Sequence, residues 1–275
     1  MASDPTETSD LDLALRLADA ADAITLARFR ARDLVVETKP DHTPVSDADR
    51  TVETAVRDTL TRHRPHDGIL GEEFGGDIAV TPGRRWIIDP VDGTKNFVRG
   101  APIWATLIAL QEDGDTVLGV VSAPALGRRW WAARAHGAWC GPSVRAAQRC
   151  RVSAVAEIGD AFLSYSSLSG WERTGRLPGF LGLTRDVART RAFGDFFSHM
   201  LVAEGAVDIS CEPEVSLWDL AALQVVVEEA GGRFTDLSGV ARADGGSVVC
   251  TNGLLHDEAL VRLVPAPAEP AIAEP

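Results

Sequence analysis

The stretch from Trp86 to Pro102 constrains this chain most, because it joins an apolar run to two closely spaced carboxylates and a glycine turn. Trp86 to Ile88 form a continuous apolar run that ends at Asp89 and Pro90, a pattern typical of a buried strand. We therefore expect the Asp89 carboxylate at the end of that strand, at a rim and outside the core. Proline fixes its own φ and lacks an N–H, so Pro90 is expected to turn the chain and bring Asp92 back toward Asp89.

Two carboxylates in one small space repel each other, which raises the pKa of one of them unless a cation lies between them. Ligand sets made only of oxygen suit Mg²⁺. Gly93 lets the backbone approach a ligand, and a helix expected to begin at Lys95 or Asn96 would point its free N–H groups toward a phosphate. The pattern thus favours a site for a metal ion and a phosphate. The alternative is that Asp-Pro and Asp-Gly are only turn-forming pairs.

The nine residues from Asp89 to Phe97 resemble the first signature of the inositol monophosphatase family, a family of Mg²⁺-dependent, lithium-sensitive phosphatases. Four other pieces of the chain also match: Lys39 to Asp49, Gly71 to Glu73, Trp218 to Ala222 and Gly231 to Gly232. The resemblance extends from about Leu11 to Leu263. It implies an α+β fold, layered as an α/β/α/β/α sandwich like that of inositol monophosphatase and fructose bisphosphatase. It also implies a homodimer.

The resemblance implies two or three Mg²⁺ ions. Glu72, Asp89 and the backbone carbonyl of Val91 would hold the first ion. Asp89, Asp92 and Asp219 would hold the second, with Asp89 bridging. Asp219 is also expected in the first turn of a helix, which favours its ionised form. The alternatives are that Glu72 is ordinary surface charge and that Asp219 is a plain helix-start aspartate.

Three further roles follow from the resemblance. Asp47 would pair with the hydroxyl of Thr94, and together they would orient the attacking water. Glu73 would bind water in the outer shell of the metal, unless it too is only surface charge. The N–H groups of Gly93 and Thr94 would hold phosphate oxygens. Asp47 has an alternative interpretation, since Ser46 or Asp47 can cap the helix that follows.

The part of the substrate beyond the phosphate is expected near Gly194, Asp195, Phe196 and Glu212, beside Asp92, Gly93, Thr94 and Asp219. Inositol-type members carry a small hydroxyl residue where this chain has Asp195, so the negative charge favours a cationic leaving group. Family members use the position of Glu212 to bind substrate hydroxyls. The alternative for Asp195 is a helix cap or an ion-pair partner of Arg189 or Arg191.

Within the family, Thr94 to Gly100 and Arg128 to Arg134 are most similar to the actinobacterial histidinol-phosphate phosphatases of histidine biosynthesis. That resemblance implies L-histidinol phosphate as the substrate and L-histidinol and phosphate as the products. Two alternatives stay open. The first is an inositol-phosphate or broad sugar-phosphate phosphatase, and the second is an accessory protein of an RNA-synthesis complex, as some relatives are.

Composition excludes some functions. With 27 basic against 40 acidic residues the net charge is −13, which argues against a nucleic-acid-binding surface. No apolar run approaches the length of a membrane span. The four cysteines lack a metal-binding spacing and no secretory leader is evident, so we expect reduced thiols and a cytoplasmic protein. A chain of 275 residues, 45% of them hydrophobic, can form one large domain or two joined lobes.

We expect a flexible arm over 1–9, an N-terminal lobe with the metal and phosphate site over 10–150, a C-terminal lobe that completes it over 151–264, and a disordered tail over 265–275. The residues between Lys39 and Asp47 are expected to be irregular. Trp130 and Trp131 should face opposite sides of a strand, one in the core and the other at an interface or pocket wall. Helices are predicted over 10–32, 196–203, 220–230 and 256–263, with another through Val52, Ala55, Val56 and Leu60. Strands are predicted over 34–38, 69–70, 86–88, 105–111, 117–122, 128–134, 137–140, 161–165, 189–192, 207–211 and 248–251.

Overall fold

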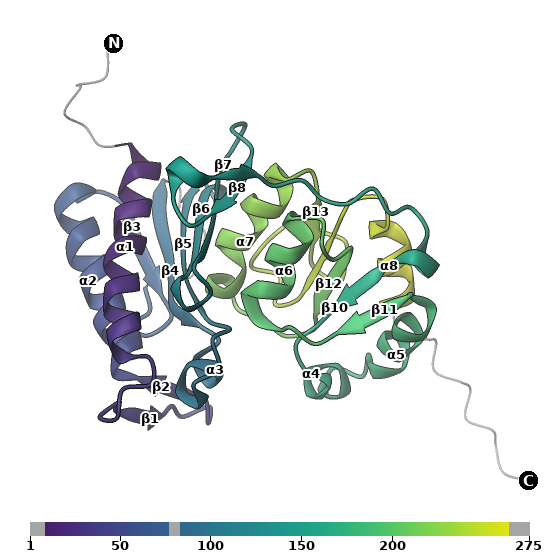
Figure 1. The fold of residues 1–275 in the computed structure, drawn as a ribbon, viewed down its shortest axis with the longest axis horizontal. Helices are drawn as coiled ribbons and strands as arrows, with labels where there is room; N and C mark the ends of the chain where they lie inside the picture. Colours follow the sequence, from purple (N-terminus) through teal and green to yellow (C-terminus); the bar gives the residue numbers. More distant parts are fainter. Residues whose placement is uncertain (1–8, 77–82, 264–275) are drawn as a thin grey trace, which may run out of the picture.

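The computed structural model describes residues 9–76 and 83–263, which stack as helices, sheet, helices, sheet and helices (Figure 1). This arrangement confirms the layered α+β sandwich expected from the sequence. Ser9, at the end of the predicted arm, accepts a hydrogen bond from the backbone N–H of Asp12 and so caps the first helix. The rest of the predicted arm and the whole predicted tail lie outside the described residues.

The outer helices α1 (Asp10–Arg28) and α2 (Asp47–His63) cover one face of the larger sheet. Trp86, Ile88 and Trp131 pack against them from that sheet. In the described ranges the sheet has the order β3-β4-β5-β6-β7-β8-β9, antiparallel except for the β3/β4 pair. Its strands are β3 (Gly68–Gly71), β4 (Arg84–Asp92), β5 (Ala105–Glu112), β6 (Asp115–Ala123), β7 (Arg128–Ala133), β8 (Ala138–Gly141) and β9 (Gln148–Arg149).

Helices α6 (Asp195–Ala203) and α7 (Leu217–Glu229) lie between the two sheets (Figure 1). Most of α7 from Leu220 to Val227 is buried, as expected for a helix that is apolar on nearly all sides. Gly119 of β6 permits this close packing, because a Cβ atom there would lie 2.5 Å from the carbonyl oxygen of Ala222. The central core therefore joins both halves of the chain.

The second sheet has the order β11-β10-β12-β14-β13 within the described residues, with β10 parallel to both β11 and β12. On its outer side Trp171 stacks on Phe180 with ring centroids 4.5 Å apart. Its strands are β10 (Phe162–Ser164), β11 (Arg189–Arg191), β12 (Ile209–Glu212), β13 (Arg233–Thr235) and β14 (Val248–Thr251). The helices outside it are α4 (Leu168–Arg173), α5 (Leu177–Asp186) and α8 (His256–Leu263).

Short elements complete the described chain. Next to the larger sheet, β1 (Val36–Thr38) and β2 (Pro44–Ser46) form a separate antiparallel pair, and α3 (Thr94–Arg99) follows β4. The 3₁₀ helices are η1 (Pro124–Leu126), η2 (Val144–Ala146) and η3 (Ile158–Asp160).

Several sequence-based predictions were wrong in detail. The segment predicted to be irregular contains β2, whose residues pair in register with β1. The strand predicted to stop at Pro90 continues to Asp92, with a register shift against β5 between Asp89 and Asp92. Both Trp130 and Trp131 are buried, because the larger sheet has a core on each face. The strand β13 was not predicted. In the described residues, no helix is both long and apolar enough to cross a bilayer.

Candidate active site

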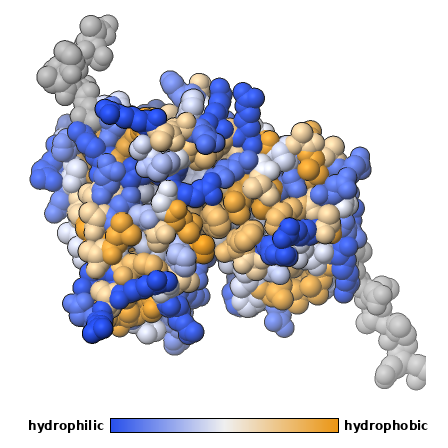
Figure 2. Space-filling model, viewed as in Figure 1, coloured by the Kyte–Doolittle hydropathy of each residue, from blue (hydrophilic) through white to orange (hydrophobic). Residues whose placement is uncertain are grey.

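A cavity of about 530 Å³ lies where the two halves of the chain meet. Its walls come from the end of β4, from α3, from the segment before α4, and from the starts of α6 and α7. The space-filling view is hollowed at its lower edge between the surfaces over α3 and α4 (Figure 2). Most of the residues predicted for metal, phosphate and substrate binding line this cavity.

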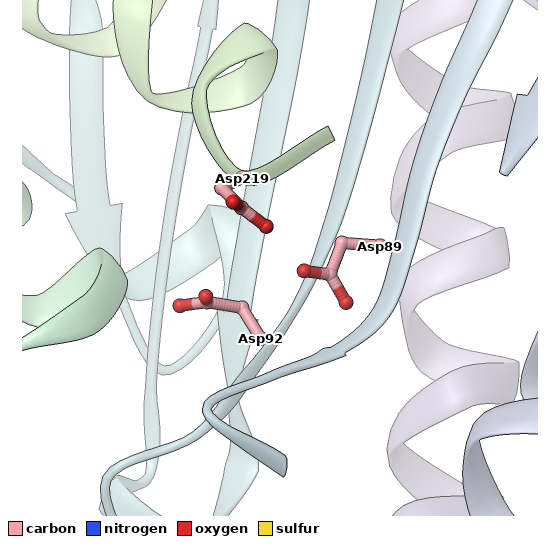
Figure 3. Close-up of side chains that lie close together, drawn as sticks. All are labelled: Asp89, Asp92 and Asp219. Carbon is pink, nitrogen blue, oxygen red and sulfur yellow. The ribbon is translucent and has the colours of Figure 1, made fainter. Parts of the chain in front are cut away.

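Asp89, Asp92 and Asp219 converge at the inner end of the cavity (Figure 3). Each offers a carboxylate oxygen, and these three oxygens lie within 4.8 Å of one another. The irregularity in β4 brings Asp89 and Asp92 together, and the first turn of α7 carries Asp219 to them. Asp89 is only 1% exposed, so its predicted position outside the core was wrong. The strand runs on past it, and α7 covers it.

The charges in this cluster oppose one another. The pKa of Asp89 is raised well above its ordinary value by burial first and then by the charges of Glu72 and Asp92. Burial, followed by the charge of Asp195, likewise raises the pKa of Asp92 well above its ordinary range. Burial also raises the pKa of Asp219 to about 7. A divalent cation would remove this repulsion, and three convergent carboxylate oxygens are the donor chemistry that Mg²⁺ prefers.

Glu72 lines the same cavity but makes an ion pair with Lys39, whose Nζ lies 2.8 Å from its Oε1 atom. Lys39 also lies 2.5 Å from Glu73. The pKa of Glu73 is raised to about 7, mainly by burial, although Lys39 acts in the opposite direction. Glu72 is therefore close enough to influence Asp89 electrostatically, while a lysine holds one of its oxygens.

Thr94 is paired with Asp49, and the predicted contact with Asp47 was wrong. The Thr94 hydroxyl lies 3.1 Å from Asp49 Oδ1 and 2.9 Å from the carbonyl oxygen of Val91. Asp47 instead makes an ion pair with Arg28 at 2.7 Å. The reason is the capping box of α2, in which Ser46 is the N-cap and Asp49 the third residue. The spacing between Ser46 and Asp49 could be recognised in the sequence as a capping box, but the prediction assigned the contact to Asp47.

Gly93 and Thr94 form the start of α3, one residue before the predicted start. Gly93 has φ 81°, a conformation that favours glycine, and a Cβ atom there would lie 2.9 Å from the carbonyl oxygen of Ile103. The turn therefore requires glycine for both its backbone angle and its space. Gly93, Thr94 and Lys95 all line the cavity.

The start of α6 lies across the cavity from α3. The backbone N–H of Phe196 donates to Asp92 Oδ2 at 2.7 Å, and Asn96 Nδ2 donates to Asp195 Oδ2 at 2.8 Å. Burial raises the pKa of Asp195 to about 7, with a further contribution from the charge of Glu212. Gly194 occupies the N-cap position of α6. These bonds join the segment around Gly93 to the opposite wall of the cavity.

The predicted alternative for Asp195, an ion pair with Arg189 or Arg191, was wrong. The Arg189 guanidinium lies over the ring of Phe162, 5.1 Å from its centroid. The Arg191 side chain donates to the carbonyl oxygen of Thr190. In the described residues, neither arginine pairs with Asp195.

Glu212 ends β12 and is joined to His199 of α6, with Oε1 and Nε2 3.0 Å apart. Lys39, Asp49, Asn96 and His199 were not assigned these contacts from the sequence. Only Asp49 had a local signal, the spacing from Ser46.

The model of the Inositol monophosphatase family matches residues 7–266. This chain belongs to the inositol monophosphatase family. Its curated relatives include a protein from Mycobacterium tuberculosis named histidinol-phosphatase, 64% identical over 92% of this chain and 97% of the relative. A histidinol-phosphatase from Streptomyces coelicolor is 58% identical over 93% of this chain and 97% of its own length.

Solved structures of family members share the fold. The extragenic suppressor protein suhB from Bartonella henselae superposes with a TM-score of 0.85 at 28% identity, over 94% of this chain and all of its own. An IMPase from Thermotoga maritima gives a TM-score of 0.80 at 30% identity, over 92% of this chain and 96% of its own. Membership in this phosphatase family agrees with the acidic cluster beside a glycine turn.

Proposed function

We propose that this protein hydrolyses L-histidinol phosphate with water to give L-histidinol and inorganic phosphate. The observation that carries the proposal is a pair of carboxylates, Asp195 and Glu212, that line a cavity beside Asp92 and Asp219 and can accept hydrogen bonds from a cationic leaving group. Histidinol carries an ammonium group and a titratable imidazole, whereas inositol and glycerol are neutral. The relatives named histidinol-phosphatase support the same substrate.

We infer that Asp89, Asp92 and Asp219 hold Mg²⁺, with Glu72 and the carbonyl of Val91 as further ligands, for two or three ions in total. When bound, Mg²⁺ neutralises phosphoryl charge, lowers the pKa of a coordinated water and stabilises the departing alkoxide. Lys39 holds Oε1 of Glu72, so ligation would fall to the other oxygen of that carboxylate. Glu73, also paired with Lys39, would stay in the outer shell.

The residues of the chain position the nucleophile and the phosphate. The Thr94 hydroxyl donates its one proton to Asp49 or to the Val91 carbonyl oxygen, so its lone pairs are free to accept from a water molecule. The backbone N–H groups of Gly93 and Thr94 would bind phosphate oxygens as the P–O ester bond breaks. Asp195 and Glu212 would bind the organic part of the substrate, and Gly194 and Phe196 would form the wall beside it.

We also propose a homodimer, by analogy with the family, and a cytoplasmic location, for which the four free thiols are consistent with a reducing compartment. Sedimentation of the purified protein tests the dimer. Neither proposal affects the chemistry of the site.

Phosphate release from a panel of esters tests the substrate. With Mg²⁺ present, kcat/KM for L-histidinol phosphate is expected to exceed that for inositol 1-phosphate and glycerol 2-phosphate by about 100-fold, which corresponds to about 2.7 kcal/mol of transition-state discrimination. Removing Mg²⁺ with a chelator should abolish all turnover. Equal turnover of the three esters would instead favour a broad sugar-phosphate phosphatase, and unchanged activity after chelation would contradict the metal assignment.

A further inference from the structure

Glu212 and Asp195, the two carboxylates on the leaving-group side, are each held by a side chain that is not a lysine or arginine. Asn96 Nδ2 donates to one oxygen of Asp195 at 2.8 Å, and His199 Nε2 lies 3.0 Å from one oxygen of Glu212. Among the described residues, no other side-chain hydrogen bond to either carboxylate is found. A neutral donor orients a carboxylate without cancelling its charge, so the remaining oxygen can still attract a cation.

His199 is a buried residue of α6. It is only 1% exposed, and its Nδ1 atom is buried with no hydrogen-bond partner in the described part of the chain. A doubly protonated ring would bury an unpaired N–H there, which is unfavourable, whereas the Nε2–H tautomer leaves only a lone pair. Since an ionised Glu212 can only accept, the proton belongs on Nε2. The His199 Nε2–H therefore donates to Glu212.

The His199–Glu212 hydrogen bond joins two residues of regular secondary structure, α6 and β12. The Ser198 hydroxyl accepts from the N–H of Gly194 at 2.9 Å and lies 2.7 Å from the hydroxyl of Ser164, which ties the first turn of α6 to β10. Glu212 pairs in register with Val248 of β14. His199 follows Asp195 by one helical turn, so α6 supplies one carboxylate of the pair and also the donor that orients the other.

Asp195, His199 and Glu212 line a cavity of about 320 Å³ that opens beside Asp92 and Asp219. Glu212 is 13% exposed at its side chain, so a ligand in the cavity can reach it. Lys95 also lines the cavity, but it lies beyond ion-pair distance of both carboxylates within the ranges described. Two aliphatic side chains, Leu220 and Leu223, cover the inner wall.

We propose that His199 is a positioning residue that fixes Glu212 to receive the cationic part of the leaving group, and thereby sets the preference for histidinol phosphate over esters of neutral alcohols. The proposal rests on the proposed function and deepens it, because it gives a buried residue that holds a substrate-binding carboxylate a role in substrate choice. His199 acts through Glu212 and does not touch the reacting atoms.

The test compares His199→Leu, which removes the donor at similar volume, with His199→Gln, whose amide can replace it. In His199→Leu, KM for L-histidinol phosphate should rise about tenfold, as expected when a hydrogen bond to a charged group is lost, with kcat changed by less than about threefold. Both constants for glycerol 2-phosphate should stay within about twofold of wild type. His199→Gln should restore the KM for L-histidinol phosphate to within about threefold of wild type.

A double-mutant cycle separates positioning from general loss of structure. Adding His199→Leu to Glu212→Gln should raise KM for L-histidinol phosphate by less than about twofold more, because both changes remove one interaction. Equal effects of His199→Leu on both substrates, or additive effects in the cycle, would overturn the role of His199 while the wild-type preference stands. A wild-type enzyme with no preference for histidinol phosphate would overturn the proposed function and this inference with it.

Discussion

Thr94 of α3 lines the cavity, and its hydroxyl contacts Asp49, which comes from a different element, α2. Asp49 is fully buried, and its second carboxylate oxygen accepts from both the N–H and the hydroxyl of Ser46. Burial raises the pKa of this aspartate, and the bonds from Ser46 and Thr94 act against that rise. The Asp49 side chain therefore caps the start of α2 through Ser46 and also holds Thr94 at the wall of the cavity.

Replacing Asp49 is expected to reduce catalysis, whereas replacing Asp47 is not. In Asp49→Asn, kcat should fall by about 10²–10⁴, the usual contribution of a positioned acid–base group. The matched variant Asp47→Asn loses only an ion pair with Arg28 at a partly exposed site, so kcat should stay within about twofold. Steady-state phosphate release measures both variants, and thermal unfolding checks that each is folded. Similar losses in the two variants would contradict the assignment.

At the level of single residues, the sequence predicted which carboxylates come together in the site, but it did not predict every hydrogen-bond partner. Asp89, Asp92 and Asp219 could be found because strand ends and helix starts carry side chains to predictable places. The pairing of Asp47 with Thr94 came from the resemblance, whereas in the structure the third residue of the capping box that Ser46 begins, Asp49, contacts Thr94. Nothing local distinguishes His199 from an ordinary core histidine, since its partner Glu212 comes from another element.

Among the elements, α7 depends most on close packing. It contacts β6 at Gly119, where a methyl group would lie 2.5 Å from the Ala222 carbonyl and 2.7 Å from a methyl of Val225. Neither the backbone of α7 nor the sheet can move aside easily, because the helix is buried between two sheets. The glycine thus sets the distance between the larger sheet and the middle layer.

Two glycine substitutions with opposite expected effects test this packing. Gly119→Ala should lower the free energy of unfolding by about 1–3 kcal/mol, since overpacking a tight core is destabilising. Gly182→Ala lies inside α5 with no atom within 4 Å of the new methyl group, and it should raise the free energy of unfolding by about 0.5–1 kcal/mol. Urea denaturation measures both. Stabilisation by Gly119→Ala would contradict the close approach of α7.

Elements with a strong internal pattern were predicted well. The final strand and final helix have the predicted bounds, Val248–Thr251 and His256–Leu263. The short strands β2 and β13 were missed because their residues carry little periodic signal, and their existence depends on the partner strand beside them. The first helix ends at Arg28, whereas the prediction extended it to about Arg32. The helix cannot continue because Arg30 adopts a positive φ.

Across the whole molecule, the acidic cluster draws on two distant parts of the chain. Asp89 and Asp92 belong to the larger sheet, and Asp219 belongs to the helix that the second sheet covers from behind. Without a cation, holding these groups ionised at neutral pH costs folding free energy, because burial and mutual repulsion raise their pKa values. A cation bound by all three would stabilise the folded protein as a unit.

Added Mg²⁺ is therefore expected to raise the unfolding temperature. At a concentration about 100 times the dissociation constant the gain is about 2.7 kcal/mol, which corresponds to roughly 5–10 °C for a protein of this size. Asp89→Asn should raise the unfolding temperature of the metal-free protein, reduce the Mg²⁺-dependent shift to near zero, and leave less than about a tenth of the wild-type activity. Differential scanning calorimetry with and without Mg²⁺ measures the shift.

The control for this experiment is Asp58→Asn, an exposed change on α2 that should leave the shift unaltered. An undiminished shift in Asp89→Asn would place the cation elsewhere.

The position of α7 between the sheets has a consequence for dividing the protein. Neither half of the chain contains the complete site. Helix α7, which carries Asp219, belongs to the second half of the sequence but packs against the larger sheet formed by the first half. A fragment ending near Arg151 would expose a broad apolar face and lack Asp219. Transplanting either half alone into another protein should accordingly fail to give a stable domain or hydrolysis.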